Sequence, residues 1–262
     1  MRYLEPQEPI PRRVFLGAMG AAALILFVAW CVASYGGFAN PLFLPTPSKV
    51  LATLSTMLRD GSLLVHIAAS TQVILIGWAA AALVAVPLGI LMGSFQLFDA
   101  VLEPPVNFVR YLPVSALIPL LILYVGIGDG ARIAVVFIGT FFQLILMVAD
   151  VAAHVPRDLL DSAYTLGTRR WRVITRVLFP ATLPGVMDSL RLTIGFAWGY
   201  VVLAEIVAAE KGLGYMILDS MRGLAVSRMF VGLLTIGLLG FAIDQLFKWL
   251  HGRLLPWSPK AA

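Results

Sequence analysis

Six stretches of the sequence are each long and apolar enough to cross a lipid bilayer as an α-helix. A spanning helix needs about 20 mostly apolar residues. Inside lipid, the backbone N–H and C=O groups find no water, so helices that satisfy these groups internally are favoured. The sequence therefore predicts an all-α fold, a polytopic membrane helix bundle with about six transmembrane helices: Val14–Ser34, Ile67–Met92, Phe108–Ile127, Ile133–Val151, Pro184–Ala208 and Phe230–Leu250.

The composition excludes several classes of protein. Hydrophobic residues make up 60% of the 262 residues and charged residues 13%, whereas soluble domains carry about 25% charged residues. The single cysteine, Cys31, excludes an internal disulfide. The three histidines are far apart in sequence, so no metal site is expected, and the net charge of +5 is too small and too local to indicate nucleic acid.

The distribution of Lys and Arg predicts that both termini lie in the cytoplasm, because cytoplasmic loops carry the excess of these residues. With that orientation the outer set is the smaller one: Lys49, Arg59, Arg132, Lys211, Arg222 and Arg228. The larger, cytoplasmic set is Arg2, Arg12, Arg13, Arg157, Arg169, Arg170, Arg172, Arg176, Lys248, Arg253 and Lys260. Arg12 and Arg13 also resemble a twin-arginine export signal. We expect an uncleaved helix after them, since the apolar stretch is long for a signal core, with a removed signal as the alternative.

The polar, basic stretch after the fourth span contains a spaced motif. Asp161-Ser162-Ala163, three residues, Gly167, nine residues, and Val177-Leu178-Phe179-Pro180 resemble the signature of ATP-binding cassette (ABC) importer permeases. In that signature the order is Glu-Ala-Ala, three residues, Gly, nine residues and Ile-x-Leu-Pro. The spacing fits throughout, with conservative departures at four positions. The positions that match are Asp161, Ser162, Ala163, Gly167, Val177, Phe179 and Pro180.

The resemblance implies that this stretch is the loop that docks into a groove of a cytoplasmic ATPase. The residues give a compatible local structure, with a short helix over Arg157–Leu166 that ends at Gly167 and a second helix from about Arg169. Ala163 and Gly167 lie four residues apart on one face, and glycine adopts the positive φ of a helix end at little cost. The alternative is an ordinary basic loop that only follows the positive-inside rule.

Further stretches are similar to permeases of the nitrate/sulfonate/taurine/bicarbonate group. They are Leu44–Ser48, Arg110–Leu120 with Gly126–Asp129, Leu190–Leu192 with Ala197-Trp198, Ala204-Glu205, and Gly212–Gly214. The group implies a type I ABC importer permease of the bacterial inner membrane. It implies as partners an ABC ATPase dimer, an extracytoplasmic substrate-binding protein and a second permease copy that forms a homodimer. ATP and Mg would be bound by the ATPase, because this sequence has no phosphate-binding Gly-x-x-x-x-Gly-Lys-[Ser/Thr] loop and needs no cofactor of its own.

The expected organisation follows from the spans and the motif. Residues 1–13 are a cytoplasmic N-terminal segment, 14–34 the first transmembrane helix, and 35–66 an outer loop with a short amphipathic helix, Ser48–Leu58, capped by Ser48. Residues 67–250 are the permease core with the coupling loop at 152–182 and a short outer helix at Lys211–Gly223. Residues 251–262 are a cytoplasmic tail.

Ionisable residues inside spans are costly and are candidates for function. Arg191 lies about 10 Å into the fifth span, with Asp188 three residues earlier on the same face. A structural ion pair between them and a gate or anion contact at Arg191 are the alternatives. Glu205, near the outer end of that helix, either lines an outer cavity or caps a loop. We expect Arg110 to snorkel at the inner interface, with a role in the path as its alternative.

Pro113 and Pro119 interrupt the third span. Each proline frees backbone groups, which neighbouring helices or a water-lined cavity must satisfy. The third span is therefore either a wall of a transport path or a packing irregularity.

The function expected from these observations is that of a transport subunit, not an enzyme, that forms a path for a small anion. Two other functions remain open, an ion-coupled secondary transporter and a non-transporting membrane anchor. The first would need acidic or histidine residues deep in several helices, and both would function without an ATPase.

Overall fold

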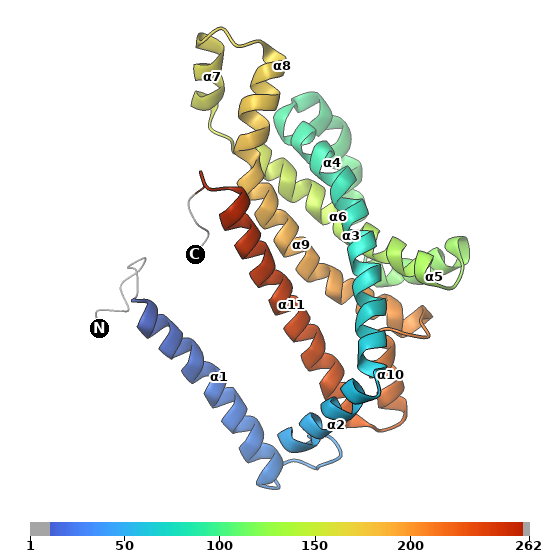
Figure 1. Ribbon diagram of the computed structural model, residues 1–262. Helices are drawn as coiled ribbons and strands as arrows, with labels where there is room; N and C mark the ends of the chain where they lie inside the picture. The colour runs from blue at the N-terminus through green and yellow to red at the C-terminus, as the bar shows by residue number, and fades with distance from the viewer. Residues whose placement is uncertain (1–10, 259–262) are drawn as a thin grey trace.

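The structure, a computed structural model, describes residues 11–258, and every element in this range is a helix (Figure 1). Residues 1–10 of the predicted N-terminal segment and 259–262 of the predicted tail, with Arg2 and Lys260, lie outside the described residues. The elements are α1 Arg12–Tyr35, α2 Pro47–Arg59, α3 Ser62–Ser94, α4 Gln96–Arg110, α5 Val114–Val125, α6 Asp129–Ala153, α7 Arg157–Thr165, α8 Arg170–Val173, the π-helical turn Ile174–Leu178, α9 Phe179–Ala208, α10 Leu213–Arg222 and α11 Val226–Leu254.

The predicted membrane bundle of about six spans is confirmed. Five helices in the described part of the chain are long and apolar enough to cross a bilayer, namely α1, α3, α6, α11 and the continuous helix Arg170–Val207. The bent pair of α4 and α5 makes a sixth if it counts as one span. The helices extend past the apolar stretches that predicted them: α3 begins at Ser62 instead of Ile67, and α11 ends at Leu254 instead of Leu250.

The third span is not the single helix Phe108–Ile127 that the sequence predicted. Helices α4 and α5 meet at 95°. Pro113 precedes the first residue of α5, with extended backbone at φ −66° and ψ 119°. A proline disfavours helical geometry in the residue before it, so the break falls here. Pro119 and the pair Pro104-Pro105 lie inside helices without ending them.

The fifth span starts earlier than the predicted Pro184. A π-helical turn, Ile174–Leu178, joins α8 to α9, so one helix runs from Arg170 to Val207 through the second half of the predicted coupling loop. Pro180 is in the first turn of α9. Since proline has no N–H for the bond to the preceding turn, the wider turn before it lets the helix continue.

The amphipathic helix α2 is also capped differently, by Thr46, whose Oγ1 accepts from Lys49 N at 3.4 Å.

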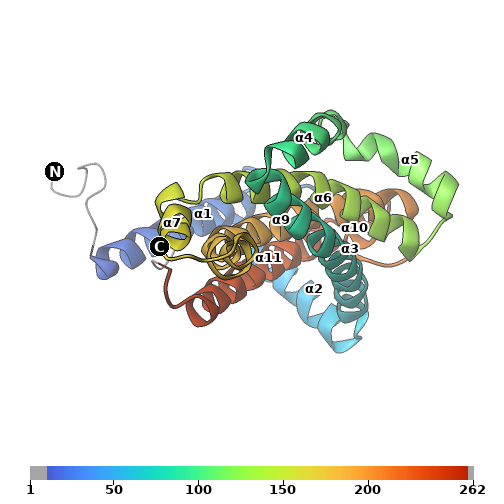
Figure 2. The ribbon, with the colours of Figure 1, turned by 90° about the horizontal axis from the view of Figure 1, so that it is seen from above.

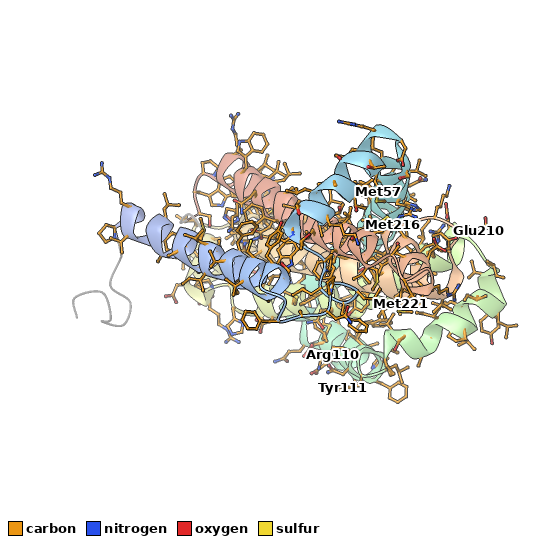
Figure 3. All side chains as sticks on the ribbon, turned by 90° about the horizontal axis from the view of Figure 1, so that it is seen from below. Met57, Arg110, Tyr111, Glu210, Met216 and Met221 are labelled. Carbon is orange, nitrogen blue, oxygen red and sulfur yellow. The ribbon has the colours of Figure 1, made fainter. Side chains whose placement is uncertain are left out.

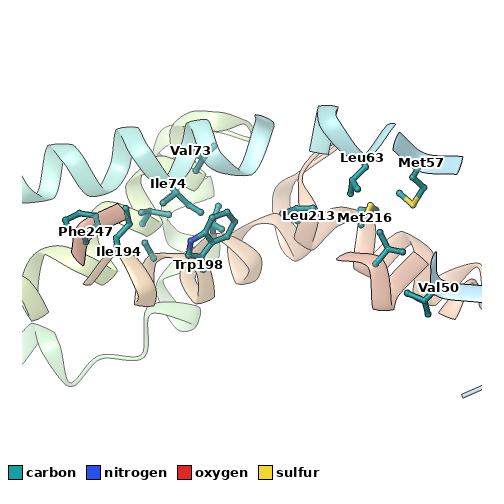
Figure 4. Packing of buried hydrophobic residues seen from close by; sticks show 14 residues of the cluster. Val50, Met57, Leu63, Val73, Ile74, Ile194, Trp198, Leu213, Met216 and Phe247 are labelled. Carbon is teal, nitrogen blue, oxygen red and sulfur yellow. The ribbon is translucent and has the colours of Figure 1, made fainter. Parts of the chain in front are cut away.

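The centre of the bundle is a close contact between α3 and α6. A Cβ at Gly77 would lie 2.9 Å from the carbonyl oxygen of Ile133, and one at Gly89 would lie 2.7 Å from that of Ile145. Such small residues allow two backbones to approach closely, which is how helices associate in lipid. Helix α9 packs against both, and the buried cluster in Figure 4 joins Ile74 of α3, Trp198 of α9 and Phe247 of α11.

Helix α1 stands apart from this centre. Figure 1 shows it as a separate rod that meets the rest of the chain near α2, and in Figure 2, seen from above, its N-terminal end extends beyond the other helices. None of its spanning window is buried inside the chain. Its anchor is Trp30, which stacks on Phe230 at a centroid distance of 5.9 Å and donates from Nε1 to Pro45 O at 3.1 Å. The surface of α1 therefore faces lipid or another chain.

Substitution of Gly89 by valine tests the α3–α6 contact. Gly89→Val places a branched side chain against the Ile145 carbonyl and Val148. We expect a loss of about 1–3 kcal/mol of stability, the usual cost of overpacking, measured as a lower midpoint of thermal unfolding in detergent. Gly237→Val in α11 is the control, because nothing lies within 4 Å of a Cβ there. Equal midpoints for the two variants would contradict the contact.

Candidate functional site

The motif loop forms a helical hairpin at one end of the bundle, where Figure 1 shows α7 and α8 projecting beyond the other helices. Helix α7 ends one residue before the predicted Leu166. Gly167 follows at φ +76°, and its N–H donates to Tyr164 O at 2.9 Å. The chain then turns into α8, and Thr168 N donates to Ala163 O at 3.1 Å. The positive φ is the reason for a glycine at this turn.

The motif residues divide into an inner and an outer set. Ala163 is buried, where its small side chain lets α7 pack against α8 and the π-helical turn. Asp161, Ser162 and Gly167 are exposed. Phe179 is 45% exposed, while Val177 and Pro180 are half-buried.

The tip of the hairpin carries exposed apolar side chains. Leu166 is 85% and Trp171 71% exposed, and Leu159 and Tyr164 are also exposed. The surrounding charge is basic, from Arg157, Arg169, Arg170, Arg172 and Arg176. Exposed apolar groups among charged ones are typical of a site that binds a protein.

At the opposite end, Glu205 caps a loop. It has no exposed surface, and its carboxylate accepts from Ser70 Oγ at 2.6 Å and from Gly214 N at 2.7 Å. Ser70 Oγ in turn accepts from Leu213 N at 2.8 Å. Of the two predicted roles, this geometry supports loop capping, because both carboxylate oxygens are bound to groups that hold the loop. Gly212 is required beside it, at φ +132°, because a Cβ there would collide with the carboxylate.

Arg132 and His66 hold the same loop from two sides. Arg132, only 3% exposed, donates from Nη1 to Lys211 O at 3.0 Å and forms an ion pair with Asp129. The Gly212 N–H donates to His66 Nδ1 at 3.2 Å. The loop before α10 is thus tied to α3, α6 and α9. Arg132 is a buried structural group instead of the loop charge that the sequence predicted.

The spacing in the sequence predicted an ion pair between Arg191 and Asp188, but the structure shows another partner for Arg191. Its Nε donates to Asp244 of α11. Asp244 Oδ2 also lies 3.3 Å from Lys248 Nζ, so one carboxylate joins two basic groups. Asp188 instead faces His251, with Oδ1 3.7 Å from Nδ1. Arg191 therefore links α9 to α11 through Asp244 instead of Asp188, and the gate or anion contact at Arg191 stays a prediction.

The corner between α4 and α5 carries an exposed arginine. Arg110 is the last residue of α4. Its guanidinium lies 4.9 Å from the ring centroid of Tyr111 and donates to Tyr111 Oη at 3.3 Å, and Figure 3 shows the two side chains together. Pro119, inside α5, leaves the Ser115 carbonyl without its helical donor.

The predicted residues therefore form separate clusters, not one site. The motif hairpin and Glu205 lie at opposite ends, while Pro113 and Arg191 belong to different packing surfaces. Sequence reasoning missed Asp244, Ser70 and His251. A signal for Asp244 was present, because an acid four residues before Lys248 stands out in an apolar stretch. Ser70 gave none, since serine is common in membrane helices.

Comparison with known proteins gives one family. The model of the binding-protein-dependent transport system inner membrane component matches residues 85–256. The taurine transport system permease protein of Escherichia coli strain K12 is 32% identical over 261 residues, which are 98% of this chain and 94% of that protein. The nitrate import permease protein of Synechocystis is 27% identical over 91% of this chain and 89% of its own.

Solved structures share the fold. A methionine ABC transporter in an inward-facing conformation superposes with a TM-score of 0.65 at 21% identity, over 72% of this chain and 94% of that chain. An amino acid ABC transporter gives 0.57 at 14% identity, over 78% and 98%. At these identities the similarity shows a shared fold alone.

Removal of the Glu205 carboxylate tests the hydrogen bonds that hold the loop before α10. Glu205→Ala leaves the Ser70 hydroxyl and the Gly214 N–H without their acceptor, at a cost of about 1–3 kcal/mol for each buried donor. We expect faster hydrogen exchange over residues 209–216 and a lower unfolding midpoint. Glu210→Ala, an exposed carboxylate in the same loop, should leave both unchanged. Exchange that is equally slow in Glu205→Ala would refute the capping role.

Proposed function

The chain belongs to the family of binding-protein-dependent transport system inner membrane components, the permease subunits of ABC importers, and we propose that it carries a small anion through a path shared with a second copy. A permease is a transport subunit, and its family implies an ATPase and a substrate-binding protein as partners. We further propose that a separate ATPase dimer binds the ATP and Mg and carries out all of the ATP hydrolysis, and that this chain holds no cofactor.

The substrate class rests on the relatives and on one exposed charge. The names of the similar proteins mention taurine and nitrate as substrates. The name of a Bacillus subtilis relative, 28% identical over 89% of this chain and 84% of its own, mentions aliphatic sulfonates. All are small anions or bear an anionic group. Arg110 is the proposed contact, because its guanidinium is exposed at the break between α4 and α5, and an arginine is suited to an oxyanion.

The α4–α5 corner is the proposed wall of the path. Pro113 and Pro119 leave backbone groups there that must meet protein or water, since lipid cannot satisfy them. Ile118 is the only buried residue of α5, and Leu123 and Tyr124 are each 76% exposed. A second copy of this chain facing α5 would enclose the polar groups of the corner between two subunits. Arg191 and Glu205 are both bonded to other residues of this chain, and their proposed role is to hold α9 in place behind this wall.

The observation that carries the ATPase coupling is the exposed tip of the α7–α8 hairpin. Leu166 and Trp171 present apolar surface on a loop that already satisfies its own backbone through the turn at Gly167. The proposed docking residues are the motif positions Asp161, Ser162, Ala163, Gly167, Val177, Phe179 and Pro180. Ala163 acts from inside by holding α7 on α8. The hairpin then lies in the cytoplasm, and both termini of this bacterial inner-membrane protein lie on the same side.

The two rival functions differ in their energy source. A secondary transporter would follow an ion gradient, and an anchor would move nothing. Uptake into proteoliposomes that contain this chain, its ATPase and its binding protein decides among the three. Uptake of labelled taurine or nitrate that needs ATP and survives an ionophore supports the proposal. Uptake that collapses with the ionophore and ignores ATP would overturn it.

Substitution of Gly167 tests the docking surface. In Gly167→Asp a side chain enters a left-handed turn that has nothing within 4 Å of the new Cβ, so the bundle should stay folded. At the centre of an interface such a change costs more than about 2 kcal/mol, or over tenfold in affinity. We expect the ATPase to be lost on copurification, measured as the ratio of the two subunits.

A matched control exists at the other end of the chain. Gly37 has φ +73° and nothing within 4 Å of a Cβ, so Gly37→Asp repeats the same backbone strain away from the hairpin. It should keep the ATPase bound. Full copurification and transport in Gly167→Asp would refute the docking surface.

Neutralisation of Arg110 tests the anion contact. Arg110→Gln should reduce uptake of the labelled anion about tenfold, the loss of one charged hydrogen bond. The ATPase activity without substrate should remain, because the docking hairpin is untouched. Arg59→Gln, an exposed outer charge, is the control for net charge. Unchanged uptake in Arg110→Gln would exclude Arg110 from the path.

A further inference from the structure

A cavity lined by both ionisable and apolar side chains lies between α9 and α11, at the end of the bundle where Figure 1 shows α7 and α8. Its volume is about 310 Å³. It lies on a different packing surface from the α4–α5 corner, so the proposed path does not account for it. Five of its lining residues are ionisable: Asp188, Arg191, Lys248, His251 and Arg253. So many ionisable groups near the end of two spanning helices are a candidate binding site.

His251 provides an independent sign that the cavity takes a ligand. The residue is only 6% exposed. Neither ring nitrogen has a hydrogen-bond partner among the described residues, and each is shielded from solvent. Asp188 Oδ1, at 3.7 Å from Nδ1, is beyond hydrogen-bond distance. Native proteins seldom leave buried polar groups without a partner, so a polar group in the cavity would complete this histidine.

The charge balance of the cavity favours an anion. Asp244 is the carboxylate shared by Arg191 and Lys248. Arg253 has no carboxylate partner in the described part of the chain, and its guanidinium lies 5.0 Å from the Trp249 ring. The cations Arg191, Lys248 and Arg253 carry three positive charges, and the carboxylates of Asp188 and Asp244 carry two negative charges. One positive charge is therefore in excess, before any proton on His251 is counted. This charge matches a group with one negative charge.

We propose that the cavity binds the phosphate of an anionic phospholipid headgroup from the adjacent leaflet. Basic pockets between transmembrane helices at the cytoplasmic side bind such headgroups. The neighbouring surface of α11 is apolar and exposed at Leu246, Trp249 and Leu254, where acyl chains would lie. Tryptophan is enriched at the depth of the headgroups. A free phosphate has the same chemistry but no use for this apolar surface, which favours the lipid.

Competition between two lipids tests the proposal. The intact transporter is purified in detergent, supplied with equal amounts of phosphatidylglycerol and phosphatidylcholine of identical acyl chains, and analysed by native mass spectrometry. Wild type should retain phosphatidylglycerol selectively. Lys248→Gln/Arg253→Gln should weaken that retention by about fivefold for each charge removed. His251→Leu should also reduce the selectivity, although it removes no permanent charge.

The matched control removes two exposed charges from α2 and α10, with Lys49→Gln/Arg222→Gln. It should retain the lipid as wild type does, and this separates the cavity from a general effect of net charge. Glycerol 3-phosphate at millimolar concentration should not displace the lipid. The lipid assignment is overturned if it does, or if Lys248→Gln/Arg253→Gln retains phosphatidylglycerol like wild type. The readout requires no transport, so it stands or falls separately from the anion path.

Discussion

The close approach of α3 and α6 is the contact on which the other helices depend. In lipid the apolar surfaces of helices gain little from mutual burial, so association depends on tight packing between small residues. Gly77 and Gly89 give α3 a flat side on which the carbonyls of α6 lie directly. Helix α9 packs into the groove beside this pair, and α11 and α10 pack on α9. Helix α1, whose spanning window is not buried inside the chain, extends away from the centre.

The spans were predictable because the physical requirement is local. A helix in lipid needs only its own length of apolar residues, and the five straight spans follow from that count. The break in the third span had a local signal too, Pro113, but the 95° angle did not. That angle depends on how α5 packs against α6 and α9. A short stretch of sequence holds no information about these contacts with distant residues. The early start of the fifth span was missed because a π-helical turn carries it past Pro180, whereas prolines predict a stop.

The partners of the charged residues were not predictable for a related reason. Spacing along a helix reveals only neighbours three or four residues away, and this favoured Asp188 for Arg191. The actual partner, Asp244, is 53 residues distant in sequence, and Ser70 is 135 residues from Glu205. Both contacts require two helices to be in register. The motif hairpin was predictable in detail, down to the left-handed Gly167, because its turn is set by a few consecutive residues.

The continuous helix from Arg170 to Val207 has a mechanical consequence. Its 38 residues span about 57 Å at 1.5 Å per residue. It begins beside Trp171 at the exposed tip and ends just beyond Glu205, at the loop before α10. A force applied at the tip would turn a helix of this length about its attachments to its neighbours, one of which is the Arg191–Asp244 link to α11. The π-helical turn Ile174–Leu178 lies in the longer of the two parts into which this link divides the helix, between the link and the tip, and such a turn is a place where a helix bends.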